Sequence, residues 1–394
     1  MIRTIQKNKI TEILKDVLSI TGIAMLFLLS LEMMTLSFMA LGNDIAGEII
    51  YATSNPFVGL FIGLLSTAII QSSSTTTTMV VAIVATGRLS LESAIPIIMG
   101  ANVGTTVTCA IVSLGHFTRR LEFKKAIAAA ALHNFFNIII VAILFPLEYM
   151  TGFISSLSTT IGSWIGSTNV GHSENTISFL SFKFILQYLN PIIEKYPLLI
   201  MLFALTLLFV AIKQFTRKLQ NMVIGKAQSR LEGLVFGGGF KSLGVGFLLT
   251  SIVQSSSVTT SLTVPLVAAR KVGLKNAFPF IMGANVGTTV TALLAAISKS
   301  DAAISIAIAH FLLNFIGVLI LFPIPTVRNL PIKLANKLGH ATAQNRLVGF
   351  AYVLITFFLF PFFLIFFSNH SNILAKSANA RKLEWIETKH RTEP

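Results

Sequence analysis

The residues best suited to bind a ligand are eight consecutive polar side chains, which lie inside an apolar stretch from residue 57 to residue 85. Residues 71–78 read QSSSTTTT. Irregular backbone at membrane depth is tolerated only where it is buried in protein or lines a watery cavity. Ser and Thr also favour helix ends, so the run predicts a re-entrant hairpin with QSSS at its tip. A helix N-terminus there would attract a phosphate-like anion, whereas polar packing between helices is the alternative interpretation.

A second polar element follows, and its residues suit a cation. Residues 100–108 read GANVGTTVT and are flanked by apolar residues. The two glycines permit the helix to unwind, which would free backbone carbonyls beside the Asn and Thr oxygens. Sodium is a hard cation and prefers such oxygen ligands. A glycine-mediated helix crossing is the alternative interpretation of the same residues.

Both elements occur twice in the chain. Residues 254–291 align with residues 71–108 without a gap, at an offset of 183, and about 23 of the 38 positions are identical. The second copies are QSSS at 254–257 and GANVGTTVT at 283–291. The chain is therefore predicted to contain two related halves, with substrate and ions bound where the halves meet near the membrane midplane.

Each half also carries His and Asn four residues apart. His133 and Asn137 in the first half match His310 and Asn314 in the second. Residues at i and i+4 share one helix face. A polar contact between helices is the favoured interpretation, and substrate or proton handling is the alternative. Glu32 lies in the first apolar run without a counterpart, and a carboxylate at membrane depth is a candidate functional residue.

The composition places these motifs in a membrane protein. Of 394 residues, 54% are hydrophobic and only 11% are charged, against about 25% charged in soluble domains. The net charge of +15 comes mainly from short Lys- and Arg-rich segments between apolar runs, which is typical of cytoplasmic loops and not of nucleic-acid binding. Runs near or above the ~18 residues that span a bilayer cover 17–42, 126–150, 196–212, 302–322 and 347–367. The chain is therefore predicted to lie in the lipid bilayer.

These features predict an all-α polytopic membrane protein with two inverted repeats, each with a re-entrant hairpin and a broken helix. The inversion follows from the basic residues, which precede the helix at 126–150 but follow its counterpart at 302–322. The predicted divisions are a first repeat at 17–150, an external loop at 151–195, a second repeat at 196–325, a linker and final transmembrane helix at 326–367, and a basic tail at 368–394.

Neither the QSSS nor the GANVGTT element contains lysine or arginine. A divalent anion bound there would be held by helix dipoles and hydroxyl groups, and cotransported cations would supply the countercharge. The motifs thus predict that anion binding is coupled to cation binding without a fixed basic residue.

The doubled QSSS and G-x-N-x-G-T elements, with the downstream H-x-x-x-N helix, closely resemble the type II sodium–phosphate cotransporter family over residues 20–350. The resemblance implies sodium-coupled import of inorganic phosphate by alternating access, with no cofactor besides the cotransported sodium. The missing cysteine-bridged external loop of animal members suits a multi-pass protein of the bacterial inner membrane. The family pattern assigns phosphate contacts to Gln71, Ser72, Ser73, Ser74, Gln254, Ser255, Ser256 and Ser257, and sodium contacts to Asn102, Thr105, Asn285, Thr288 and Thr291.

Departures from the family pattern bear on sodium. Ala101 and Ala284 stand where many members have Ser, and Asn134 follows His133 where some members have Asp. Electrogenic animal members carry an acid after the first GANVGTT element, and only Glu122, among basic residues, matches it here. These differences predict two sodium ions for each divalent phosphate, so that no net charge moves. The oligomeric state stays open, with a homodimer as one candidate.

Other functions are compatible with parts of the pattern. A sodium-coupled symporter of another oxyanion or of a carboxylate is the nearest alternative. An intramembrane serine hydrolase would use a Ser with His133 or His310, but the sequence lacks a G-x-S-x-G nucleophile elbow. A channel would not need the inverted, broken-helix pattern typical of alternating access. The chain is therefore predicted to be a transporter and not an enzyme.

Overall fold

The computed structural model describes residues 2–41, 53, 55–168, 182–223, 238–297, 299–363 and 366. Within these residues the regular structure is helical and no strand is present. Six helices of this part are long and apolar enough to cross a membrane, namely Leu18–Ala40, Leu91–Leu114, Arg120–Thr151, Pro197–Phe215, Leu274–Ala296 and Asp301–Leu321. The predicted fold class, an all-α polytopic membrane protein, is confirmed.

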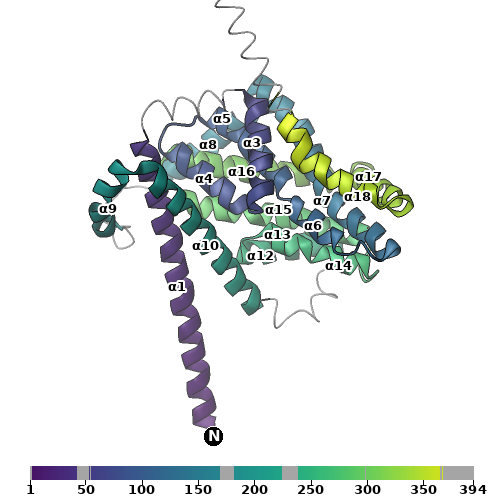
Figure 1. The fold of residues 1–394 in the computed structure, drawn as a ribbon, viewed down its shortest axis with the longest axis horizontal. Coiled ribbons are helices and arrows are strands. Elements are labelled where there is room, and N and C mark those ends of the chain that lie inside the picture. Colours follow the sequence, from purple (N-terminus) through teal and green to yellow (C-terminus); the bar gives the residue numbers. More distant parts are fainter. Residues whose placement is uncertain are drawn as a thin grey trace, which may run out of the picture.

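In each half, two helical arms joined at the QSSS element form a hairpin (Figure 1). The first hairpin consists of α3 (Pro56–Ile70) and α4 (Ser73–Ala85). In the second, α12 (Gly239–Val253) is followed by α13 (Ser256–Ser261) and α14 (Thr263–Ala268). The second arm is split at Leu262. Pro265 follows three residues later and has no backbone N–H to donate to a helical hydrogen bond. The two predicted hairpins are thus present, whereas their depth in a membrane stays a prediction.

The GANVGTT elements lie in helices that cross the hairpins closely. The first element, residues 100–108, begins in the last turn of α5 (Leu91–Gly104) and runs through a short turn into α6 (Val107–Leu114). The second lies inside α15 (Leu274–Ala296), which is continuous. The predicted break is therefore present in the first half and wrong for the second. The sequence suggested that these glycines would unwind the helix, but the structure gives them a packing role.

Backbone contact explains the glycines. A Cβ atom at Gly100 would overlap the carbonyl oxygen of Leu60 in α3, and one at Gly283 would overlap that of Leu243 in α12. The pairs α3–α5 and α12–α15 are also the most extensive helix contacts of the described chain. Glycine-mediated crossing, the alternative interpretation, is what both repeats use.

The other helices surround these crossings. The His and Asn pairs lie on α7 (Arg120–Thr151) and α16 (Asp301–Leu321). The long helix α1 (Ile2–Ala40) packs along α10 (Pro197–Val223) and extends beyond the other helices at its N-terminal end (Figure 1).

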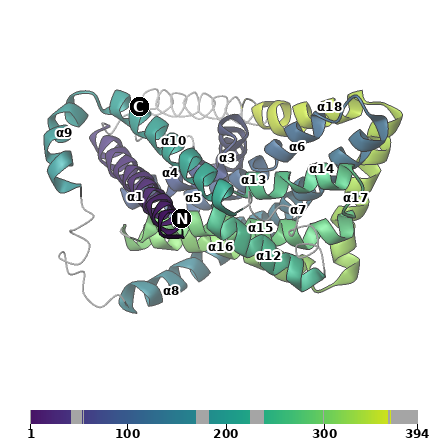
Figure 2. The ribbon, with the colours of Figure 1, turned by 90° about the horizontal axis from the view of Figure 1, so that it is seen from below.

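The segments expected to be connections are also helical where described. Within 151–195 lie α8 (Phe153–Thr168) and α9 (Lys183–Lys195), and after the second repeat come α17 (Pro325–Gln344), α18 (Leu347–Leu354) and a π-helical turn at Ile355–Leu359. Helices α8 and α9 lie at one end of the molecule and α17 and α18 at the other (Figure 2). The side of the membrane that 151–195 faces stays a prediction, and the tail 368–394 lies outside the described residues.

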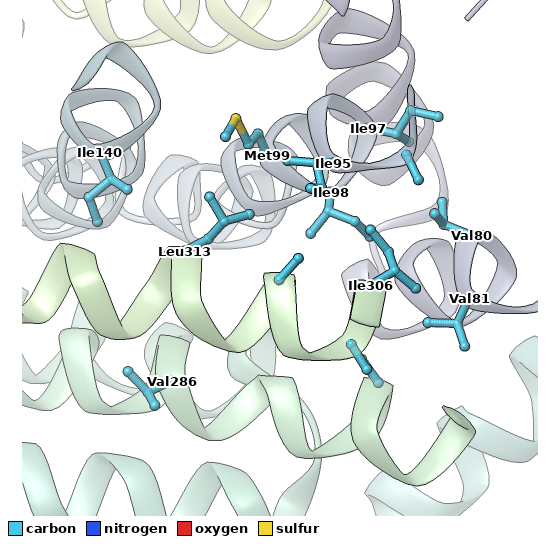
Figure 3. Packing of buried hydrophobic residues seen from close by; sticks show 14 of the residues in the cluster. Val80, Val81, Ile95, Ile97, Ile98, Met99, Ile140, Val286, Ile306 and Leu313 are labelled. Carbon is cyan, nitrogen blue, oxygen red and sulfur yellow. The ribbon is translucent and has the colours of Figure 1, made fainter. Parts of the chain in front are cut away.

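One apolar core joins the two halves. Val80 of α4 and Ile98 of α5 come from the first half, and Val286 of α15 and Ile306 of α16 from the second (Figure 3). All four side chains are less than a tenth exposed and belong to the same cluster. The halves therefore share one apolar core, and this core supports a site that lies between them.

Candidate functional site

Both hairpins turn through a glutamine whose backbone is in the left-handed region. Gln71 has φ 56° and ψ 28°, and Gln254 has φ 56° and ψ 27°. Among the described residues other than glycine, only these two and Arg270 have positive φ. Such conformations cost about 1–3 kcal/mol and cluster at functional sites. The same unfavourable geometry in both repeats therefore marks the tips as functional candidates.

The first serine of each tip caps the helix that follows. Ser72 Oγ accepts a hydrogen bond from Thr75 N at 3.2 Å, and Ser255 Oγ accepts one from Val258 N at 3.4 Å. The cap fixes the start of α4 and of α13. Further N–H groups in the first turn of a helix have no intrahelical partner, and the helix dipole makes this end partly positive. Each tip thus presents a helix N-terminus suited to an anion.

The two tips touch. Ser74 Oγ of the first tip donates a hydrogen bond to the backbone oxygen of Gln254 in the second, at 3.0 Å. Beside this contact lies a pocket of about 470 Å³. Five of the eight predicted phosphate residues line it, namely Gln71, Ser72, Ser74, Ser255 and Ser257. The structure therefore brings residues from positions 71–74 and 255–257 into one site.

The other three predicted residues do not line this pocket. Ser73 and Ser256, the middle serines, are buried, as are their neighbours Ser74 and Ser257. Gln254 contributes the backbone oxygen that Ser74 contacts. A phosphate contact by these three residues stays a prediction.

Two basic residues complete the pocket and were missed by the sequence reasoning. Lys213 and Arg217, both exposed and on α10, line the pocket beside the serines. The expectation of a site without a fixed basic residue is therefore wrong for the pocket. The sequence suggested a loop after residue 212, but α10 continues to Val223. Had the helix been predicted to continue past residue 212, its periodicity would have placed Phe209, Lys213 and Arg217 on one face.

The Asn of each GANVGTT element pairs with the His of the other repeat. Asn285 Oδ1 lies 2.7 Å from His133 Nε2, and Asn102 Oδ1 lies 3.0 Å from His310 Nε2. Asn285 Nδ2 also donates to Asn137 Oδ1 at 3.0 Å. The favoured interpretation, a polar contact between helices, is confirmed, and the contact runs between repeats. Each amide oxygen still has a second lone pair for another partner.

The predicted sodium threonines differ in their hydrogen bonding. Thr105 Oγ1 donates to Ala101 O at 2.9 Å, and Thr288 Oγ1 donates to Ala284 O at 3.0 Å. These two are back-bonded to their own helices. Thr291 Oγ1 is buried and has no hydrogen-bond partner in the described chain. Of the predicted threonines, Thr291 is therefore the one whose oxygen most needs a ligand.

Unpaired buried hydroxyls occur at equivalent positions of the two repeats. Thr108 and Thr291 form one pair at the offset of 183, and Thr67 and Thr250 form another. A buried polar group without a partner requires an explanation such as an ion or a water. Thr67, Thr108 and Thr250 were missed by the sequence reasoning. The sequence could have indicated them, because the alignment of the two repeats continues upstream to Thr67 and Thr250 without a change of offset.

Two of the acids near these helices, Glu122 and Glu32, are paired with basic residues. Glu122 lies 2.9 Å from Arg119 and 3.4 Å from His116. Glu32 is bonded to Lys299 at 3.0 Å, and the Lys299 side chain is only 10% exposed. No cluster of three or more His, Cys, Asp or Glu side chains occurs in the described residues. A cation at the site would therefore be held mainly by neutral oxygens, which suits sodium.

Comparison with known proteins identifies a family whose model covers both motifs. The model of the Na+/Pi-cotransporter family matches residues 26–164 and 207–335, which include both tips and both GANVGTT elements. The sodium-dependent phosphate transport protein 2A of Rattus norvegicus is 31% identical over 429 residues, which cover 89% of this chain and 67% of the relative. That of Ovis aries is 30% identical, with 85% and 65% covered.

The 2B protein of Homo sapiens is 29% identical over 86% of this chain and 63% of its own length. The chain thus spans about two thirds of the length of these relatives. No solved structure gives a significant match. Since the family model covers well over half of the chain, including every residue that lines the tips, the chain belongs to the Na+/Pi-cotransporter family.

Proposed function

We propose that this protein imports inorganic phosphate together with sodium, as a multi-pass symporter of the bacterial inner membrane. The observation that carries the proposal is the single pocket that Ser74 and Ser257, from different repeats, line together. An anion in it would be bound by both repeats at once. A movement of one repeat against the other would then open or close the site, as alternating access requires. The names of the relatives support phosphate and sodium as the cargo.

The donors of the pocket suit a tetrahedral oxyanion. Hydroxyl groups, helix N-termini and two cationic side chains can serve several oxygens of one anion, and such charge-assisted hydrogen bonds are strong. Competition of phosphate uptake by sulfate, arsenate and dicarboxylates distinguishes phosphate from the alternative anions. The Nε2 atoms of His133 and His310 face Asn oxygens and not serines. This pairing favours transport over serine hydrolysis.

Sodium is proposed to bind at the neutral oxygens beside the tips. Thr108 and Thr291 offer unpaired hydroxyls, and Thr108 also lines the phosphate pocket. Asn102 and Asn285 retain a lone pair for a cation. A sodium ion near Thr108 would place positive charge next to the bound phosphate. The two ligands would then raise each other's affinity, which is the coupling that symport needs.

Transport by the purified protein tests the proposal directly. Proteoliposomes loaded without phosphate should accumulate labelled phosphate when sodium is present outside, and should not when choline or potassium replaces it. Uptake that runs equally well on a proton gradient without sodium would contradict the sodium assignment. Accumulation of sulfate or a dicarboxylate in preference to phosphate would instead identify the cargo as another anion.

Replacing Thr291 by valine should lower sodium affinity by roughly tenfold or more, the size of a bond to a charged group. Stability without sodium should not fall, because valine removes a buried hydroxyl that has no partner. The measurement is the sodium dependence of the melting temperature and of phosphate uptake. Thr289→Val is the matched control on the same helix, since Thr289 Oγ1 is already bonded to Val286 O at 2.7 Å. Equal sodium affinity in wild type and Thr291→Val would remove this residue from the site.

The variants Lys213→Gln and Arg217→Gln should each raise the KM for phosphate by up to about fivefold, as expected for exposed charges near an anion. The effect should shrink at high ionic strength because salt screens exposed charges. Lys218→Gln is the control, since Lys218 lies on the same helix but pairs with Asp16 at 2.7 Å. The same KM change in all three variants would indicate a general charge effect and not a contact in the pocket.

Transport is expected to be electroneutral, with two sodium ions for each divalent phosphate. Glu122 and Glu32, the acids that would add a further cation site, are paired with Arg119 and Lys299. A net charge moved would couple uptake to the membrane potential by about 2.3 kcal/mol per 100 mV. Tracer uptake should therefore be unchanged at imposed potentials, with no phosphate-evoked current. An inward current in proportion to uptake would show that a third cation is carried.

A further inference from the structure

A second pocket, of about 400 Å³, lies between α7, α17 and the junction of α14 with α15. Its polar lining is basic, with Lys124 and Lys125 from α7, Lys275 from α15 and His340 from α17. No acidic residue lines it. It shares no lining residue with the pocket at the hairpin tips, so it is a separate site.

Within the described residues, no acid balances the charge of this pocket. None of Lys124, Lys125 and Lys275 forms a salt bridge in the described part of the chain. Lys124 and Lys125 are adjacent in α7 and only partly exposed, so their two positive charges lie close together. Gathering like charges in a half-buried pocket is unfavourable. An anion from outside the chain would remove this repulsion.

The fold holds these side chains together. A Cβ atom at Gly339 would lie 2.6 Å from Lys124 O, so this glycine lets α17 approach the start of α7 closely. Its neighbour His340 is thereby brought to the pocket beside Lys124. The first turn of α15, at Leu274 and Lys275, also lines the pocket and adds the partial positive charge of a helix N-terminus. Apolar side chains, among them Val267 and Ile332, form the rest of the wall.

We propose that this pocket binds a phosphate-bearing anion, either the headgroup of an acidic lipid or free inorganic phosphate. Basic pockets between transmembrane helices are suited to anionic headgroups, and the apolar wall gives an acyl chain a surface to contact. Free phosphate would satisfy the same cations. The pocket would then be a second anion site, which stabilises the packing of α7, α15 and α17 apart from the transported ion.

Binding to the purified protein in an uncharged detergent tests the proposal. Three probes are titrated separately, namely phosphatidylglycerol, phosphatidylcholine and inorganic phosphate without sodium, and native mass spectrometry or a melting shift reports binding. The variant Lys124→Gln/Lys275→Gln should bind the anion that occupies the pocket, phosphatidylglycerol or inorganic phosphate, roughly 25-fold more weakly. This figure combines about fivefold for each lysine. The control Lys333→Gln/Lys337→Gln removes the same charge from exposed positions of α17 outside the pocket and should bind as wild type.

Each outcome decides the question. Loss of phosphatidylglycerol binding in the pocket variant alone identifies a lipid headgroup site, and loss of sodium-independent phosphate binding in it alone identifies a free-phosphate site. Equal loss in both double variants, or no loss in either, would overturn the proposal. Lys275→Gln, at an exposed position, gives the same comparison if the double variant does not purify. Phosphate uptake is not needed for the readout, so failure here leaves the proposed transport function untouched.

Discussion

Replacing Ser74 or Ser257 by alanine should weaken phosphate binding by about 10- to 150-fold. Both serines line the pocket where the two tips meet, and a hydrogen bond to a charged group contributes about 1.5–3 kcal/mol. Both variants should have effects in this range, because each repeat contributes serines to the lining of the pocket. Ser74 Oγ has one proton, which it donates to Gln254 O at 3.0 Å; because it must give up this bond to donate to phosphate, Ser74→Ala should have the smaller effect of the two. Phosphate affinity by calorimetry in saturating sodium is the measurement.

The middle serines provide the control within the same motif. Ser73 and Ser256 do not line the pocket, so Ser73→Ala and Ser256→Ala should change phosphate affinity much less, contrary to the phosphate contact that the sequence motif predicts for them. The sequence motif alone would give all the serines equal weight. If the middle serines have the larger effect and Ser74 and Ser257 bind normally, the pocket described above is not the phosphate site.

The variant Gly246→Ala should destabilise the protein markedly. A Cβ atom at this position of α12 would overlap the carbonyl oxygen of Phe280 and lie 3.1 Å from Ala284 N, both in the backbone of α15. Overpacking of this kind costs about 1–3 kcal/mol or more, which exceeds the roughly 1 kcal/mol that alanine gains over glycine in a helix. The melting temperature in detergent should fall by several degrees, and uptake should fall with it.

A glycine two residues away isolates the cause. A Cβ atom at Gly244, also in α12, would meet nothing within 4 Å. Gly244→Ala should therefore leave the melting temperature unchanged or raise it, since only the helix propensity changes. Both variants share the same helix and the same chemical change. If they lower the melting temperature equally, close contact between α12 and α15 does not hold the second repeat together.

The repeated motifs were sufficient to predict the centre of the molecule. A polar run that cannot face lipid must break a helix, and the same run occurring twice made two hairpins the simplest arrangement. Both are present, and Gln71 and Gln254 have the same backbone angles within a degree. The prediction worked because it depended on local chemistry: capping serines and the cost of exposing polar groups in a membrane.

What the sequence could not predict depends on contacts between distant segments. Whether Gly283 unwinds a helix or lets it touch another depends on the backbone of α12, and it does the second. The approach of Lys213 to the tips requires α10 to continue past its apolar part and to lie against them. The exchange of partners between repeats, His133 with Asn285 and His310 with Asn102, is likewise a property of the assembled fold.

The central claim is that both repeats form one phosphate site whose occupation requires sodium. The most direct test is an equilibrium titration of the purified protein with labelled phosphate, in a detergent that contains no acidic lipid. In sodium, one phosphate should bind at the hairpin tips of each chain, with no comparable affinity at this site in potassium, and Ser74→Ala and Ser257→Ala should each weaken that same site by about 10- to 150-fold. Two sodium-dependent phosphates per chain, of which each variant removes only one, would contradict the claim, and so would equal affinity of the tip site in sodium and in potassium.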